Sequence, residues 1–500
     1  MTKRTRIRAP HFADTDGSRL LMVFIAAWIA VVIALTASFS TATQVRAEIL
    51  FDRLAHVAIG FAVCAGLALL ITRLCLRDLW SNKLGYLLIA AMAIAGVGMA
   101  INLGGYCTFP GTWENPNLGE ATDMAREWQW IACYKSTGSY MPYSNIGYTT
   151  IAAFAVDRLG PGISGPLLLN IIMLCGTLGC AATMAAILFP DRNGKKIAFY
   201  AALLTAAVAS IIWYPTILLK ETCVTFGVSL FGVALAAIYR HRMNAARFIA
   251  AALGAYLLMM VKGPIGWFLI AGILIVCARF DRKNPKRYLT TYASGLLLII
   301  LCGTTVIGGK QFRYTPDLEI IGAVEGRTIG NQQFMGEYAT VERYSELIPH
   351  YFESPSPKRI LQLPLTASAQ FFPPFPWNYT RDTDEGNFVW YAHLSFLWYF
   401  VAGCALGYFV LCAWRKELRG GLGRWALWWV ICYLGIAWFS GGTVARYYLP
   451  FIPCLAPLAL RFLECAKAKL VSRRSVKIYA ISYTALLCIG LTAAYIFLKL

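Results

Sequence analysis

The chain has 500 residues and a net charge of +20; 58% of its residues are hydrophobic and 14% are charged. Its mean hydropathy of +0.58 far exceeds what one soluble core requires, so the composition excludes a soluble globular protein and indicates an integral membrane protein. The positive charge matches the positive-inside rule and attraction to anionic lipid, and we assign no nucleic-acid partner.

Apolar runs long enough to cross roughly 30 Å of hydrocarbon predict about thirteen transmembrane helices. The runs lie near 20–42, 54–73, 85–103, 163–189, 197–215, 221–239, 247–261, 264–279, 289–307, 392–413, 424–441, 448–465 and 477–498. The stretch 247–279 is either two crossings or one broken, re-entrant pair. The first run follows a basic leader but is longer than a typical signal-peptide core, so we expect a retained anchor.

Every second loop between these runs is basic. The basic stretches lie at 4–8, 73–77, 192–196, 240–242, 282–287, 415–419 and 467–474. Short loops rich in Lys and Arg remain in the cytoplasm. We therefore expect a multi-pass protein of the cell inner (plasma) membrane, with a cytoplasmic N-terminus and two long extracytoplasmic loops.

The predicted organisation has five parts. They are the N-terminal tail with three spans (1–103), the first extracytoplasmic loop with interfacial helices (104–162), the central spans (163–307), the large extracytoplasmic loop (308–391) and the C-terminal spans (392–500). The two loops are where we expect the chemistry.

The first loop carries acids at helical spacing. A helix is predicted over 119–134, where Glu120, Asp123 and Glu127 recur at intervals of three and four and so share one face. Three acids on one face repel unless something cationic meets them. That partner is a neighbouring Arg or Lys, a divalent metal, or a substrate hydroxyl whose proton one carboxylate accepts; the alternative is a solvated polar face.

The large loop combines acids with aromatic residues. Its segment FFPPFPWNYT at 371–380 contains three prolines, which fix φ and present Trp377 and Tyr379. Aromatic faces beside carboxylates suit a sugar, and the alternative is a segment that returns along the membrane interface, with Trp377 and Trp390 as belt residues.

Three cations lie at the outward ends of predicted spans, against the positive-inside trend: Lys220 in WYPTILLKET, Lys262 in LLMMVKGP and Arg446 in GGTVARYYLPFIP. Each alone could snorkel to lipid phosphates. Together they favour a shared anionic partner, and Arg446 is the strongest candidate because a guanidinium binds phosphate bidentately. Glu221 is available to hold Lys220.

The fifteen cysteines are scattered, and no metal-ligand spacing of Cys or His is present. Cys107 and Cys133 flank the first loop and could pair in an oxidising compartment, the alternative being two free thiols.

The chain resembles the GT-C superfamily of integral membrane glycosyltransferases, in the bacterial branch related to mannosyl- and aminoarabinosyl-transferases. The resemblance rests on Asp123 through Glu127, NIGYTTIAAFAVDRLGP at 145–161, the YPTILLKET turn and RYYLPFIPCLAPLAL near the end, together covering about 104–240 and 440–460.

The resemblance implies a polyprenyl-phosphate-linked sugar donor and a lipid, glycan or protein acceptor, with Asp123 as the catalytic base, Glu120 as runner-up, and Arg446 and Lys220 holding the carrier phosphate. From their positions in the sequence, Lys262 and Tyr447 are added to the phosphate site, and Trp377, Tyr379 and Glu221 are expected to contact the sugar or acceptor. A single in-line displacement would invert the anomeric carbon. No cofactor is required, although a divalent metal is possible, and no metal ligands are assigned.

Two other classes remain open. An envelope polysaccharide polymerase or ligase would use polyprenyl-diphosphate-linked glycans and favour several outward arginines over one loop carboxylate. A lipid-linked sugar transporter or flippase would show paired repeats and intramembrane charge.

Overall fold

The computed structural model describes helices and the turns that join them. The residues described are 47–77, 79–80, 85, 88–96, 98–99, 120–141, 145–159, 164–189, 192–216, 218–262, 293, 295–297, 300, 367, 371, 395–414, 425, 428–434, 448–467 and 471–499. Among them there is no strand, so the all-α prediction is confirmed for this part of the chain. The predicted spans 20–42 and 264–279 lie outside it, as does nearly all of the loop 308–391.

Four of the described helices are long and apolar enough to cross a membrane: Gly165–Leu188, Glu221–Tyr239, Leu449–Lys467 and Arg473–Ala493. Shorter apolar helices cover Ala62–Cys75, Ala245–Leu258 and Leu397–Cys412. Each coincides with a span predicted from the sequence. The helices support a membrane-embedded protein.

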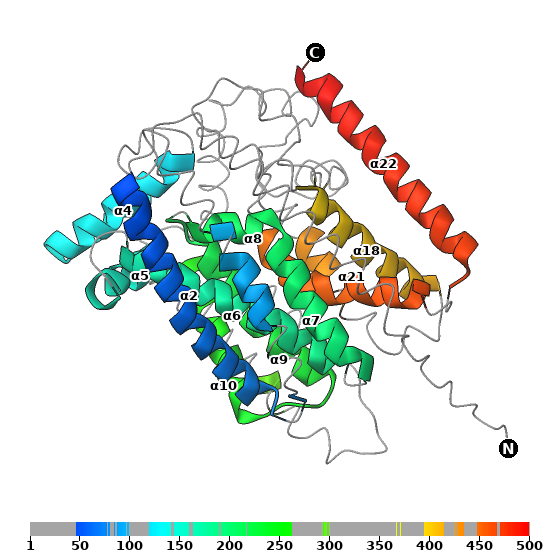
Figure 1. Cartoon of the computed structure of the whole chain (residues 1–500), viewed down its shortest axis with the longest axis horizontal. Helices are drawn as coiled ribbons and strands as arrows, with labels where there is room; N and C mark the ends of the chain where they lie inside the picture. Colours follow the sequence, from blue (N-terminus) through cyan, green and yellow to red (C-terminus); the bar gives the residue numbers. More distant parts are fainter. Residues whose placement is uncertain are drawn as a thin grey trace.

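The centre of the bundle is formed by α6 (Ser164–Leu188) and α9 (Glu221–Tyr239), which pack against each other. In both, 89% of the apolar window is buried inside the protein. Around them lie α2 (Ala47–Cys75), α7 (Arg192–Ala207), α10 (Ala245–Lys262) and α21 (Ile452–Lys467), as Figure 1 shows. A helix that is apolar on every side is stable only when neighbours or lipid cover every side, and α6 and α9 are covered by neighbours.

Glycines permit a close helix crossing between α9 and α10. A Cβ placed on Gly254 would lie 2.7 Å from the carbonyl oxygen of Gly227 and 3.0 Å from the backbone nitrogen of Phe231. The missing side chain therefore lets the two backbones touch, which is the usual way that membrane helices gain packing contacts. Because α9 and α10 are consecutive, the start of α9 and the end of α10 lie at the same pole of the bundle.

The C-terminal helix α22 (Arg473–Lys499) docks on α18 (Ser395–Trp414) through two tyrosines. The hydroxyl of Tyr479 donates to the carbonyl of Gly403 and that of Tyr483 to the carbonyl of Tyr399, both at 2.6 Å. None of the apolar window of α22 is buried, and this helix runs along the edge of the bundle in Figure 1. Its remaining apolar surface suits contact with lipid.

Arginines close the opposite pole, where several helices end. Arg247 is 1% exposed, and its Nε donates to the carbonyl of Cys75, at the end of α2, at 2.9 Å. Arg240, which follows α9, donates to Leu188 at the end of α6. Cations at helix C-termini satisfy unpaired carbonyls and interact favourably with the partial negative charge at that end of the helix. The basic stretches at 73–77 and 240–242 thus meet at one pole, as their alternation in the sequence predicts.

One predicted span differs from the structure. The run 197–215 is not a single helix, because α7 ends at Ala207 and Val208 is extended, with φ −74° and ψ 118°. A short helix α8 (Ala209–Trp213) and a 3-10 turn η1 (Tyr214–Thr216) follow. Pro215 lacks the N–H that a continuing helix needs, and Thr205 bonds back to the carbonyl of Ala201, a contact that bends helices. Apolar composition alone could not reveal this break.

The glycine crossing gives a direct test of the packing. We predict that Gly254→Ala lowers the free energy of unfolding by about 1–3 kcal/mol, because its Cβ would meet backbone atoms that cannot move aside. Thermal unfolding of the purified protein in detergent would measure the change. The matched control is Gly66→Ala within α2, where a Cβ meets nothing within 4 Å and should leave stability unchanged or slightly higher. Equal effects of the two variants would contradict the crossing.

Candidate functional site

The first-loop helix predicted over 119–134 is present as α4 (Glu120–Thr137), and it rests on α5 (Ile146–Arg158). Tyr134 and Tyr140 stack with ring centroids 4.5 Å apart, and the Tyr140 hydroxyl lies 2.7 Å from Oγ1 of Thr150. Lys135 and Asp157 form an ion pair between the two helices. These contacts fix α4 relative to α5.

The N-terminus of α5 is fixed in turn to the end of α10. The side chain of Asn145 caps α5 by accepting from the backbone N–H of Tyr148 at 3.1 Å, and its amide donates to the carbonyl of Val261 at 2.8 Å. Gly147 permits this approach, since a Cβ there would lie 2.0 Å from the carbonyl oxygen of Met260. The loop helices therefore sit at the pole where α9 begins and α10 ends.

An ion pair joins the loop helix to the membrane bundle. The Nζ of Lys220 lies 3.3 Å from Oε1 of Glu127, which is 93 residues away in sequence. The Glu127 side chain is 3% exposed and that of Lys220 is 25% exposed. The packing of α4 thus brings a carboxylate of the first loop to Lys220, a partner that the sequence did not assign to it. The expectation that Glu221 holds Lys220 stays a prediction.

Lys220 occupies the N-cap position of α9, and its side chain makes no capping hydrogen bond. A helix N-terminus carries a partial positive charge, so an ammonium there is unfavourable unless an anion is close. Glu127 supplies that anion. The start of α9 is therefore a strongly electropositive point that a buried carboxylate neutralises.

A second carboxylate and a phenol surround this pair. Glu221 is 3% exposed at the first position of α9, and Tyr148 of α5 is 1% exposed. Burial raises the pKa of Tyr148 well above its usual value, and the charges of Glu127 and Glu221 raise it further. The phenol thus remains protonated and can donate a hydrogen bond. The cluster brings together an ammonium, two carboxylates and a neutral phenol.

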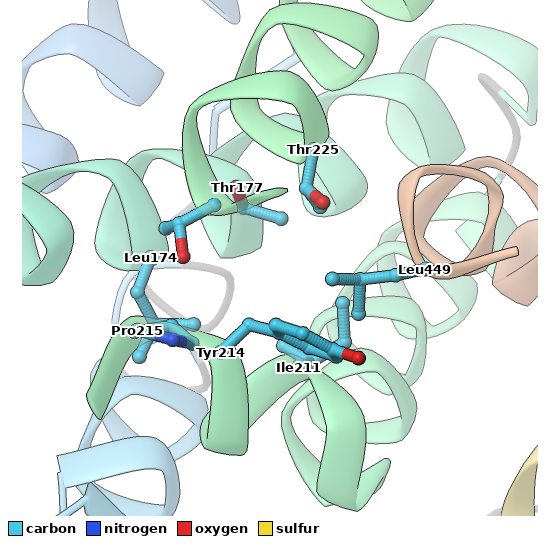
Figure 2. Close-up of a pocket in the computed structure, with 8 residues that line it drawn as sticks. Leu174, Thr177, Ile211, Tyr214, Pro215, Thr225 and Leu449 are labelled. Carbon is cyan, nitrogen blue, oxygen red and sulfur yellow. The ribbon is translucent and has the colours of Figure 1, made fainter. Parts of the chain in front are cut away.

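A small cavity lies between α6, the end of α8 with the turn η1, and the start of α9 (Figure 2). Thr222, the residue after Glu221, is part of its lining. Its volume is about 10 Å³, close to the space of one water molecule. Figure 2 shows Thr177 and Thr225 on one side and the ring of Tyr214 on the other. The lining residues are Leu174, Thr177, Ile211, Tyr214, Pro215, Thr222, Thr225 and Leu449.

Thr222 gives the cavity its polar character. It is 3% exposed, and its Oγ1 has no hydrogen-bond partner within the described part of the chain. The wall opposite is held by Asn170, whose amide donates to the carbonyl of Pro215 at 3.1 Å. A space of this size can hold one ordered water that satisfies such a buried hydroxyl.

The other predicted site residues are located as follows. Asp123 and Glu120 lie on the first turn of α4, and Lys262 is the last residue of α10, but their side chains are outside the described part. Trp377, Tyr379, Arg446 and Tyr447 lie outside the described residues entirely. Of the nine predicted site residues, the structure thus brings Lys220 and Glu221 into one cluster.

The predicted pairing of Cys107 and Cys133 involves one residue outside the described part, Cys107. Cys133 is described, and its Sγ lies 3.7 Å from Oγ1 of Thr137. In the part of the chain that the structure describes, no group of three or more His, Cys, Asp or Glu side chains could hold a metal ion.

The structure adds Tyr148 to the site and gives Glu127 a partner that the sequence did not assign. The available signal for Glu127 was its shared face with Asp123, and the signal for Tyr148 was the Asn145 cap three residues earlier. Neither pattern specifies that Glu127 meets Lys220 or that Tyr148 lies beside the charges of Glu127 and Glu221, because both depend on how α4, α5 and α9 pack.

Comparison of the chain with models of protein families, with curated proteins and with solved structures finds no match.

Proposed function

We propose that the protein is a membrane glycosyltransferase that moves a sugar from a polyprenyl-phosphate carrier to an acceptor at the extracytoplasmic face. In this proposal the chain has a GT-C-like arrangement of about thirteen spans, with the N-terminus in the cytoplasm of an inner-membrane protein. The two long outward loops cover the active site.

The observation that supports this proposal best is the Lys220–Glu127 pair. An acid from the first-loop helix and a cation from the start of a membrane helix meet there at 3.3 Å, at the pole opposite the arginine-rich helix ends. A charged pair at the end of apolar helices is costly unless it serves binding or chemistry. A carrier lipid presents its phosphate at this depth while its chain stays in the bilayer.

The chemistry requires two charge changes. As the bond between the anomeric carbon and the phosphate oxygen breaks, negative charge builds on the departing phosphate and needs cations. As the acceptor hydroxyl attacks the same carbon, its proton must pass to a base. A single in-line displacement moves both electron pairs and inverts the anomeric centre.

Asp123 is the proposed base, with Glu120 as the alternative. Asp123 precedes Glu127 by four residues on α4, hence about 6 Å along the axis and on the same face. Since Glu127 meets Lys220, an acid one turn earlier on α4 is our candidate to serve an acceptor near the same phosphate. Tyr148, which is 1% exposed beside the charges of Glu127 and Glu221, is the proposed hydrogen-bond donor of the cluster.

The remaining proposed roles belong to residues whose side chains the structure does not describe. Arg446, Lys262 and Tyr447 join Lys220 around the phosphate, and Trp377 and Tyr379 contact the sugar or acceptor together with Glu221. Leu449, three residues after Arg446 in the sequence, lines the same cavity as Thr222, two residues after Lys220. The contact between η5 (Leu449–Phe451) and α9 supports the proposal that the two cations share one phosphate.

The first prediction concerns donor class and the base. Purified protein should transfer labelled sugar from polyprenyl-monophosphate donors, and Asp123→Asn should reduce the rate by a factor of about 100 or more because general-base assistance is lost. The assay uses a panel of monophosphate and diphosphate donors. The matched control is Glu464→Gln, which removes an acid that pairs with Arg461 within α21, away from the cluster, and should leave the rate unchanged.

Transfer from diphosphate-linked glycans, or growth of a glycan chain, would replace the proposal with a polymerase or ligase. Absence of transfer from every donor would point instead to the transporter class. Equal rates for Asp123→Asn and the wild type would show that Asp123 is not the base, and would leave the proposed donor class unchanged.

A second prediction concerns Arg446. Arg446→Ala should raise the donor concentration needed for half-maximal transfer by about tenfold or more, because a bidentate contact to the phosphate is lost. The measurement is the donor dependence of the initial rate at saturating acceptor. Arg474→Ala, at the start of α22, controls for the loss of one positive charge. Unchanged donor dependence in Arg446→Ala would contradict the phosphate role.

A further inference from the structure

The start of α9 holds two sources of positive charge at one point. One is the ammonium of Lys220 at the N-cap, and the other is the N-terminal end of a helix of 19 residues. Anions stabilise that charge: Glu127 contacts the ammonium at 3.3 Å, and Glu221 lies in the first turn of the helix. A phosphate would meet the same need with more charge and more acceptor oxygens.

The two partners of this ion pair differ in freedom. Glu127 is held on a helix that is tied to α5, and its side chain is 3% exposed. Lys220 is 25% exposed and carries its charge on a flexible four-carbon stem. The lysine therefore has more freedom to turn toward an incoming anion than the buried carboxylate has to follow it.

We propose that Glu127 is a built-in competitor of the substrate phosphate, and that Lys220 exchanges the Glu127 carboxylate for the phosphate of a polyprenyl-phosphate lipid when that lipid binds. The inference rests on the proposed function and deepens it, because it states that Glu127 balances the charge of Lys220 before the lipid binds. No covalent bond changes in this exchange. One ion pair breaks and another forms on the same ammonium.

The exchange has a consequence that a purely positioning carboxylate would not have. Removing a competitor strengthens phosphate binding, whereas removing a residue that only orients Lys220 weakens it. Glu127 therefore lowers the affinity of the site for the lipid, and it keeps the Lys220 ammonium paired while no lipid is bound. The sign of the effect separates the two roles.

The experiment measures binding of farnesyl phosphate to the full-length protein in detergent, with farnesol and inorganic phosphate as separate arms. Glu127→Gln should bind farnesyl phosphate about fivefold more tightly, the factor expected from the loss of a partly exposed ion pair. Lys220→Met should bind it at least about fivefold more weakly. In the double variant the gain from Glu127→Gln should disappear, because no ammonium remains to be released.

The controls address folding and charge. Glu127→Gln preserves the size of the side chain, and thermal unfolding verifies that each variant is folded. Glu464→Gln removes another ion-paired acid, the partner of Arg461 within α21, and should leave binding unchanged. Tighter binding of inorganic phosphate by the same factor, with no further gain from the farnesyl chain, would support the exchange and assign it to a free phosphate as ligand.

The outcomes separate this inference from the function on which it rests. If the wild type binds farnesyl phosphate and Glu127→Gln binds it equally or more weakly, the exchange is wrong and the proposed donor stands. If the wild type binds neither farnesyl phosphate nor inorganic phosphate, both the donor and the exchange are wrong. If Lys220→Met binds as well as the wild type, Lys220 is not the phosphate ligand and the exchange fails.

Discussion

The contact between Lys220 and Glu127 is the interaction on which the organisation of this pole depends. An ammonium at the N-terminus of a helix that can cross a membrane is unfavourable by itself, and so is a carboxylate that is almost fully buried. Each becomes tolerable because the other is close. The pair also joins α4, which belongs to a loop, to α9, which belongs to the centre of the bundle, and so brings loop chemistry to the membrane helices.

The rest of the fold holds that contact in place. Gly254 lets α10 approach α9 closely, Asn145 ties α5 to the end of α10, and Lys135 with Asp157 ties α4 to α5. The result is a continuous series of packed elements from one partner of the ion pair to the other. At the opposite pole, Arg240 and Arg247 satisfy the carbonyl ends of α6 and α2. The two poles thus differ in chemistry: one caps helices with arginine, and the other concentrates acids around a lysine.

The interruption between α7 and α8 is a place where the composition predicts one helix and the structure contains two. Residues 197–215 are apolar enough to suggest one span, yet the chain is extended at Val208 and turns at Pro215. The break places Tyr214 and Pro215 beside α6 and the first turns of α9, where they enclose a water-sized cavity with Thr222. A continuous helix would have carried these residues past that point. Irregular backbone inside a bundle is tolerated where neighbouring side chains satisfy its polar groups, as Asn170 does for Pro215.

The sequence by itself determined the class of the protein, because membrane embedding and helix positions follow from local composition: long apolar runs, alternating basic loops and helical spacing of acids. The ends of α6, α9 and α21 and the existence of α4 could be predicted for that reason. The contact of Glu127 with Lys220, and the position of Tyr148 beside the charges of Glu127 and Glu221, were decided only by the tertiary structure. Those contacts join residues on different helices. Their distances depend on helix crossing angles and on close approaches at glycines, which no local pattern specifies.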